Sequence, residues 1–110
     1  MKTDIQSPGF TVNPELTGYI HEKIEKLSRY YGEIIACEVA LRLDSSTAKE
    51  NKICSIRLFI PGNDLLASAQ YKKFEQAIAQ VVETLRRQIK KLKTKAIARR
   101  KDNIQLEKKL

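Results

Sequence analysis

The sequence contains few of the residues from which enzyme active sites are built. It has one histidine, two cysteines and four glycines in 110 residues. So few glycines leave little material for a phosphate-binding loop, and no metal-ligand cluster or nucleophile elbow is visible. The lone histidine, His21, lies about 100° or more from the apolar stripe of the helix expected there, which is typical of a solvated side chain. We therefore expect no enzyme activity, no metal, no cofactor and no small-molecule substrate.

The cysteines and the hydropathy pattern bear on where the protein resides. Cys37 and Cys54 lack C-x-x-C spacing and fall on inward positions of two expected strands, as inert core thiols do. Pairing these strands across the loop at 44–51 places Cys37 opposite about Leu58, not opposite Cys54. No apolar run reaches the roughly 18 residues of a membrane span, and the N-terminus lacks the apolar region of a signal peptide. We expect a cytoplasmic protein with reduced thiols that does not bind membranes.

Positive charge is concentrated in one segment. Nine of the 21 basic residues lie between Arg86 and Lys101, where no acidic residue occurs, and the remaining 12 are balanced by 13 acidic residues. The net charge of +8 is therefore one local block on a nearly neutral body. Such a block attracts polyanions, above all nucleic acid.

The N-terminal part predicts a strand and then a helix. Residues 2–7 form the strand, which a Pro-Gly pair closes. In VNPEL, Asn13 can cap a helix whose first turn contains Pro14, and Gly32 ends it. The apolar stripe of this helix consists of Leu16, Ile20, Ile24, Leu27 and Tyr31.

Three strands follow, in IIACEVALRL, KICSIRLFI and LLASAQ. Alternation predicts that one side of each strand is buried. In the last strand, Ala67 and Ala69 are small enough to let a helix pack closely. The inward positions of the first two are Ile35, Cys37, Val39, Leu41, Leu43, Cys54, Ile56, Leu58 and Ile60.

A long second helix is predicted from about Lys72, and its apolar stripe fades after Leu92. We expect one domain at 1–98 and a basic tail at 99–110, either frayed helix or disordered. The order β-α-β-β-β-α favours an α+β two-layer sandwich, with a four-stranded mixed sheet and both helices on one face. The stripe of the second helix is Phe74, Ile78, Val81, Val82, Leu85, Ile89 and Leu92.

Cationic side chains flank this stripe on both sides. Arg86, Lys90 and Lys93 follow one flank at helical spacing, and Arg87, Lys91 and Lys95 follow the other. A solvated helix usually mixes in glutamate at i, i+4, whereas these like charges repel one another without compensation. The run therefore indicates an anionic partner, and phosphates of folded RNA or DNA are suitable ligands.

The first helix adds a smaller basic ridge beside its apolar stripe, at i, i+4, i+7 and i+11. Two lysines between two tyrosines can hold phosphates and stack on a ribose or base. The alternative is that the tyrosines pack at the edge of the core and the lysines are solvated. The ridge consists of Tyr19, Lys23, Lys26 and Tyr30.

Together these elements resemble the ribosome hibernation-promoting factor and ribosome-associated inhibitor family, also called sigma-factor modulation proteins. The likeness covers residues 1 to about 98 and rests on TGYIHEKIEKLSRYYGEI, LLASAQ and FEQAIAQVVETLRRQIKKLKTK. It implies a fold like the double-stranded-RNA-binding domain. It also implies a stress and stationary-phase translation inhibitor that binds ribosomal RNA in the decoding channel of the small subunit and excludes messenger and transfer RNA.

The resemblance also assigns binding roles to single residues. It implies RNA contacts for Lys23 and Lys26 in the first helix, whereas Arg86 and Lys90 are candidates from helical periodicity alone. The chain departs from the family at 72–74, where KKF stands in place of the usual acidic residue and tyrosine. In the second helix, the residues that match basic positions of the family are Arg87, Lys91, Lys93 and Lys95.

The chain stops where long members of the family continue into a dimerising domain, so we expect a short form that is a monomer off the ribosome. Two other functions remain open at this point. One is a general double-stranded RNA-binding protein, which shares the charge argument. The other is a protein-interaction module that modulates a transcription factor, for which binding tolerates high salt.

Overall fold

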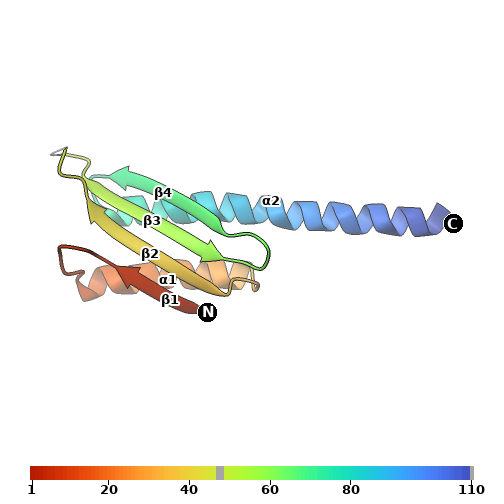
Figure 1. Ribbon diagram of the computed structural model, residues 1–110, viewed down its shortest axis with the longest axis horizontal. Coiled ribbons are helices and arrows are strands. Elements are labelled where there is room, and N and C mark those ends of the chain that lie inside the picture. Colours follow the sequence, from red (N-terminus) through yellow and green to blue (C-terminus); the bar gives the residue numbers. More distant parts are fainter. Residues whose placement is uncertain (47–48, 110) are drawn as a thin grey trace.

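The computed structural model describes the backbone of residues 1–46 and 49–109, and side chains up to residue 94 within those ranges. Its elements follow the predicted order β-α-β-β-β-α (Figure 1). Over these residues, no helix is both long and apolar enough to cross a bilayer. The elements are β1 (Lys2–Gln6), α1 (Pro14–Tyr30), β2 (Ala36–Leu43), β3 (Lys52–Phe59), β4 (Leu65–Tyr71) and α2 (Phe74–Lys109).

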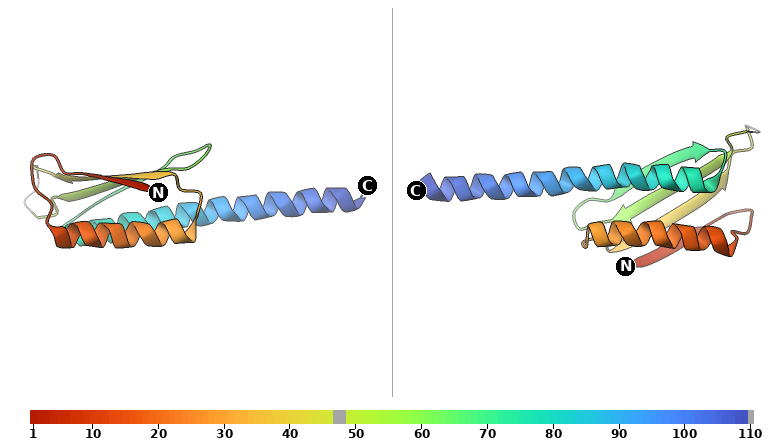
Figure 2. Two further views of the ribbon diagram at one scale, coloured as in Figure 1. Left: turned by 90° about the horizontal axis from the view of Figure 1, so that it is seen from below. Right: turned by 180° about the vertical axis from the view of Figure 1, so that it is seen from behind.

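The four strands form one mixed sheet in the order β1-β2-β3-β4. The first two strands are parallel, and the β2–β3 and β3–β4 pairs are antiparallel. Cys37 lies opposite Leu58, as the pairing across the loop predicted. Both helices cover the same face of the sheet, and the other face is open (Figure 2). The predicted two-layer α+β sandwich is thus confirmed, while the likeness to the double-stranded-RNA-binding domain stays a prediction.

The first helix begins as its sequence predicts. The Asn13 side chain accepts a hydrogen bond of 2.7 Å from the Leu16 backbone N–H, and Pro14 occupies the first turn. Four residues of the predicted stripe are buried, but the fifth is not. Tyr31 is half-buried in the capping position after α1, and its hydroxyl donates to Glu33.

The core lies between the sheet and the helices, and it corrects the prediction for β2 at both ends. Cys37, Val39 and Leu41 are buried, but Ile35 and Leu43 are 60% and 49% exposed. Ile34, between the turn that follows α1 and the start of β2, enters the core instead of Ile35. The inward residues predicted for β3 are all buried, as is Ala67 of β4.

The second helix is fastened to the sheet along its N-terminal half. Ile78, Val81, Leu85 and Ile89 are fully buried, and Leu92 is partly buried. Beyond this point α2 projects past the sheet (Figure 1). The backbone is helical through Lys109, whereas the side chains of the predicted tail at 99–110 lie outside the described residues. The division of the chain at residue 98 therefore stays a prediction.

Candidate nucleic-acid interface

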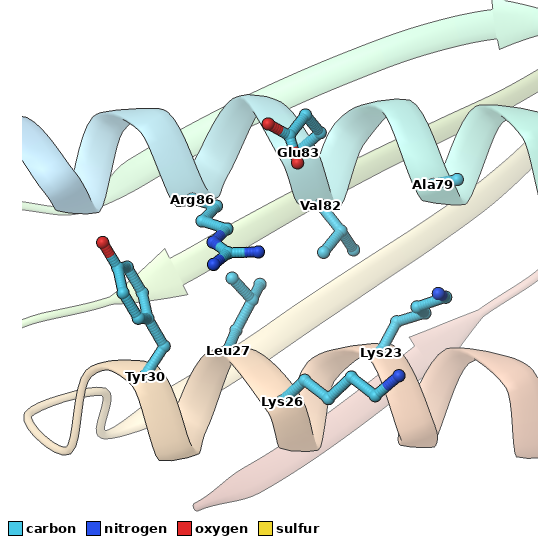
Figure 3. Close-up of a pocket in the computed structure, with 8 residues that line it drawn as sticks. All are labelled: Lys23, Lys26, Leu27, Tyr30, Ala79, Val82, Glu83 and Arg86. Carbon is cyan, nitrogen blue, oxygen red and sulfur yellow. The ribbon is translucent and has the colours of Figure 1, made fainter.

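A groove of about 480 Å³ separates α1 from α2 on the helical side of the sandwich (Figure 3). Its floor is apolar, because Leu27 and Val82 face each other across it with Ala79 beside them. Basic side chains stand around this floor from both helices. The residues that line the groove are Lys23, Lys26, Leu27, Tyr30, Ala79, Val82, Glu83 and Arg86.

At one end of the groove, the Tyr30 ring contacts two cations from α2. The Arg86 guanidinium carbon lies 5.1 Å from the ring centroid, and Lys93 Nζ lies 4.2 Å from it. Residues seven apart are separated by about 10.5 Å along a helix, so the ring lies between the two attachment points. Lys93 also donates a hydrogen bond of 3.2 Å to the Tyr30 carbonyl oxygen, at the negative end of the α1 dipole. The aromatic ring therefore holds the two cations near each other.

The basic ridge of α1 points into the same region. Lys23 Nζ lies 5.4 Å from the Tyr19 ring centroid, and the Tyr19 hydroxyl donates to the Glu75 carbonyl oxygen of α2 at 3.4 Å. Lys26 lies 3.5 Å from Glu22, but both side chains are 62% exposed, and such surface pairs contribute little. The ridge predicted from the sequence thus supplies three residues of the groove, and its remaining member joins the two helices.

The outward surface of α2 carries further cations in a different grouping from the two predicted flanks. Lys90 lies with Arg87 and Lys91 around a shallow hollow, while Arg86 and Lys93 turn toward Tyr30. At 100° per residue, the Lys90 position is rotated about 40° from that of Arg86 toward Arg87, which places Lys90 between the two flanks. Lys95 lies outside the side chains that the structure describes.

The prediction that this charge is wholly uncompensated is wrong for Arg87. Its Nε atom lies 3.6 Å from Glu83, one helical turn earlier and outside the block of basic residues. Among the described side chains, no carboxylate lies within ion-pair distance of Arg86, Lys90 or Lys91. The helical side therefore keeps most of its excess charge unpaired.

Two features of the groove were missed in the sequence. Glu83 was not singled out, although its position four residues before Arg87 was a visible signal of a helical neighbour. Val82 was predicted on the core stripe and does pack against the core, but it is half-buried and also lines the groove. The sequence of one helix does not reveal the second wall of the groove, because α1 and α2 are distant in the sequence.

The two cysteines contribute no reactive thiol. Both are buried, and neither forms a disulfide. Burial raises the pKa of Cys37 and of Cys54 to about 12, because a thiolate loses its hydration in the core. His21 is exposed on α1. Over the described residues, no group of three potential ligands is arranged to hold a metal ion.

The chain is similar in sequence to known proteins. The chain is 27% identical over 99 residues to the ribosome hibernation promoting factor of Azotobacter vinelandii, with 90% of this chain and 89% of that protein covered. It is 31% identical over 97 residues to the ribosome hibernation promotion factor of Bacillus subtilis, covering 86% of this chain and 50% of that protein. The chain thus spans nearly the whole of one relative and half of the other.

Solved structures show the same fold. The ribosomal subunit interface protein from Coxiella burnetii superposes with a TM-score of 0.76 at 18% identity, over 86% of this chain and 99% of that one. The N-terminal domain of Thermus thermophilus Protein Y gives 0.72 at 19% identity, over 84% and 99%. The model of the family described as Sigma 54 modulation protein / S30EA ribosomal protein matches residues 3–97. The resemblance seen in the sequence is thereby confirmed, and the chain belongs to this family.

Proposed function

We propose that this protein is a ribosome-associated hibernation factor of the cytoplasm that inhibits translation in stressed or stationary-phase cells. It binds ribosomal RNA of the small subunit in the decoding channel and blocks messenger and transfer RNA by occupying their place. The names of the relatives support the ribosome as the partner. A role without catalysis fits a groove in which three basic side chains, Lys23, Lys26 and Arg86, stand around an apolar floor.

The observation that carries the proposal is the convergence of cations from two helices that are distant in the sequence. Lys23 and Lys26 of α1 meet Arg86 of α2 around one groove, and Lys90 and Lys91 extend the surface without a carboxylate partner among the described side chains. Phosphates are the ligands that such spaced, unpaired cations prefer. The proposed RNA-binding set is Lys23, Lys26, Tyr30, Arg86, Arg87, Lys90, Lys91, Lys93 and Lys95.

Within this set, Tyr30 and Lys93 have a supporting role. The ring holds Arg86 and Lys93 at the groove, and Lys93 is bonded to the end of α1. The remaining cations of the set face the RNA, and most of them meet its phosphates. If six to eight phosphates are engaged, affinity should fall by roughly 10³- to 10⁵-fold between 50 and 200 mM salt.

The test is co-sedimentation of the purified chain with ribosomes, using the double substitution Arg87→Glu and Lys91→Glu. Both side chains lie off the buried stripe, so the fold should persist while binding is lost. A matched control is Lys2→Glu with Arg42→Glu, which changes the net charge equally at two exposed residues of the sheet. The control should still bind. Equal sedimentation of wild type and the Arg87/Lys91 variant refutes the assignment.

A second arm separates ribosome binding from general affinity for RNA duplexes. An unrelated double-stranded RNA is added in excess to the ribosome mixture. A ribosome-specific factor remains on the particles, whereas a general duplex binder is displaced. Binding that resists both high salt and nuclease indicates instead a protein-interaction module.

A further inference from the structure

The groove contains one acidic residue among its cations, and that residue has unused acceptor capacity. The distance of 3.6 Å between Arg87 Nε and Glu83 exceeds that of a hydrogen bond. The Glu83 side chain is 51% exposed at the groove. A site that binds only phosphates gains nothing from a carboxylate on its wall, since the two repel each other. Glu83 forms a long ion pair with Arg87 but no hydrogen bond, so its carboxylate remains available to a ligand group that donates hydrogen bonds.

The floor and the end wall of the groove fit a flat, partly apolar ligand. Leu27, Ala79 and Val82 form an apolar floor, and the volume of about 480 Å³ lies within the range of small-molecule sites, about 300–1,000 Å³. Arg86 lies at one end of the groove beside Tyr30, with its guanidinium carbon 5.1 Å from the ring centroid (Figure 3). A guanidinium plane is a surface on which nucleobases stack.

We propose that the interhelical groove binds one unstacked guanine of an RNA strand. The base stacks on Arg86 over the apolar floor, and Glu83 accepts two hydrogen bonds from its Watson–Crick edge. Guanine alone presents two adjacent donors there, N1–H and the 2-amino group, which match the two oxygens of a carboxylate. Lys23 and Lys26, farther along the groove, meet the flanking phosphates. This inference rests on the proposed RNA binding and adds a base preference to it.

The test uses the full chain and short labelled oligonucleotides of uridine with one central guanosine, inosine or uridine. Inosine lacks only the 2-amino group, so it removes one of the two hydrogen bonds to Glu83. Fluorescence anisotropy at low salt should show roughly ten-fold tighter binding of the guanosine oligonucleotide than of the inosine one. Equal affinities of the wild-type chain for these two oligonucleotides, or no binding of either, overturn the proposal.

Two substitutions test which residues produce the preference for guanosine. Glu83→Gln should bind the guanosine and inosine oligonucleotides nearly equally, while the control Glu25→Gln should retain the wild-type ratio. The control is matched because Glu25 also precedes an arginine by four residues, at 2.7 Å, but does not line the groove. Arg86→Lys keeps the charge and removes the planar group, so it should weaken guanosine binding several-fold with an unchanged salt dependence. A preference that survives Glu83→Gln refutes the assignment.

Co-sedimentation with ribosomes distinguishes this failure from failure of the proposed function. If the wild-type chain binds ribosomes but does not prefer guanosine to inosine, only the base site is wrong. If it prefers guanosine yet never binds ribosomes, the base site stands and the ribosomal function fails.

Discussion

The helical side and the open face of the sheet both present basic side chains, but these are held in different ways. On the open face, Arg57 donates two hydrogen bonds to Asp64 at 2.9 and 3.2 Å and lies 5.2 Å from the Phe59 ring centroid. Glu38 is its cross-strand neighbour. On the helical side, Arg86 and Lys93 share an aromatic ring, and no carboxylate among the described side chains pairs with them.

The difference shows that the number of cations on a surface does not identify a binding site. A guanidinium that already donates two hydrogen bonds to a carboxylate, as Arg57 does, has little to gain from a phosphate, because it must first break those bonds. Arg86 rests on an aromatic ring and has no carboxylate partner among the described side chains, so it keeps its hydrogen-bond donors for a ligand. The helical side is therefore the face that we propose for a polyanion, whereas Arg57 on the open face is already held by Asp64.

Removal of a buried leucine should distinguish the two faces most strongly. Leu85 is fully buried between α2 and the sheet, whereas Leu66 on the open face is 63% exposed. Leu85→Ala should lower the free energy of unfolding by about 2–5 kcal/mol. Leu66→Ala should change it by less than about 0.5 kcal/mol. Urea denaturation monitored by circular dichroism measures both. A large loss in the Leu66 variant contradicts the comparison, because it requires a packing layer on the open face.

Alkaline pH should weaken the core between the two faces. Cys37 and Cys54 have pKa values raised from 9.0 to about 12 in the folded protein, so above pH 9 the unfolded chain releases protons that the folded chain retains. The contribution of these protonated thiols to the free energy of unfolding is fully present below pH 9. It decreases as the pH rises toward 12. By pH 10 the loss should be about 1 kcal/mol per cysteine.

Comparison of unfolding at pH 8 and pH 10 for wild type and the double Cys→Ala variant isolates this contribution. The two proteins are otherwise identical in sequence, so only the thiols differ. The variant is expected to be less stable than wild type at pH 8, but its free energy of unfolding should fall by less between pH 8 and pH 10. Identical losses in the two proteins contradict burial of the thiols.

Local patterns in the sequence were sufficient for the fold. Alternation identified the buried side of β3, and the Cys37–Leu58 register followed from loop length. The pattern failed at the ends of β2, where Ile35 and Leu43 continue the alternation without a helix to cover them. Alternation reports which side a residue faces, and only the packed structure reports whether that side is covered.

The candidate site was predictable only in part, because its two walls come from separate helices. Periodicity found the cations of each helix. It did not show that Arg86 and Lys93 meet the same Tyr30 ring, or that Glu83 and Val82 border the groove. Such contacts depend on the relative position of α1 and α2, which burial of both stripes against one sheet determines.

The smallest effect is expected from removing the aromatic ring that contacts a cation on each of the two faces. Tyr30→Leu removes the ring from two cations and should cost about 1 kcal/mol of stability, whereas Phe59→Leu should cost less, since Asp64 still holds Arg57. Tyr30→Phe keeps the ring and should resemble wild type. On ribosomes, Tyr30→Leu should weaken binding several-fold without changing its salt dependence, because no charge is removed. A reduced salt dependence instead means that releasing Arg86 and Lys93 breaks phosphate contacts, and that the ring is needed for those contacts to form.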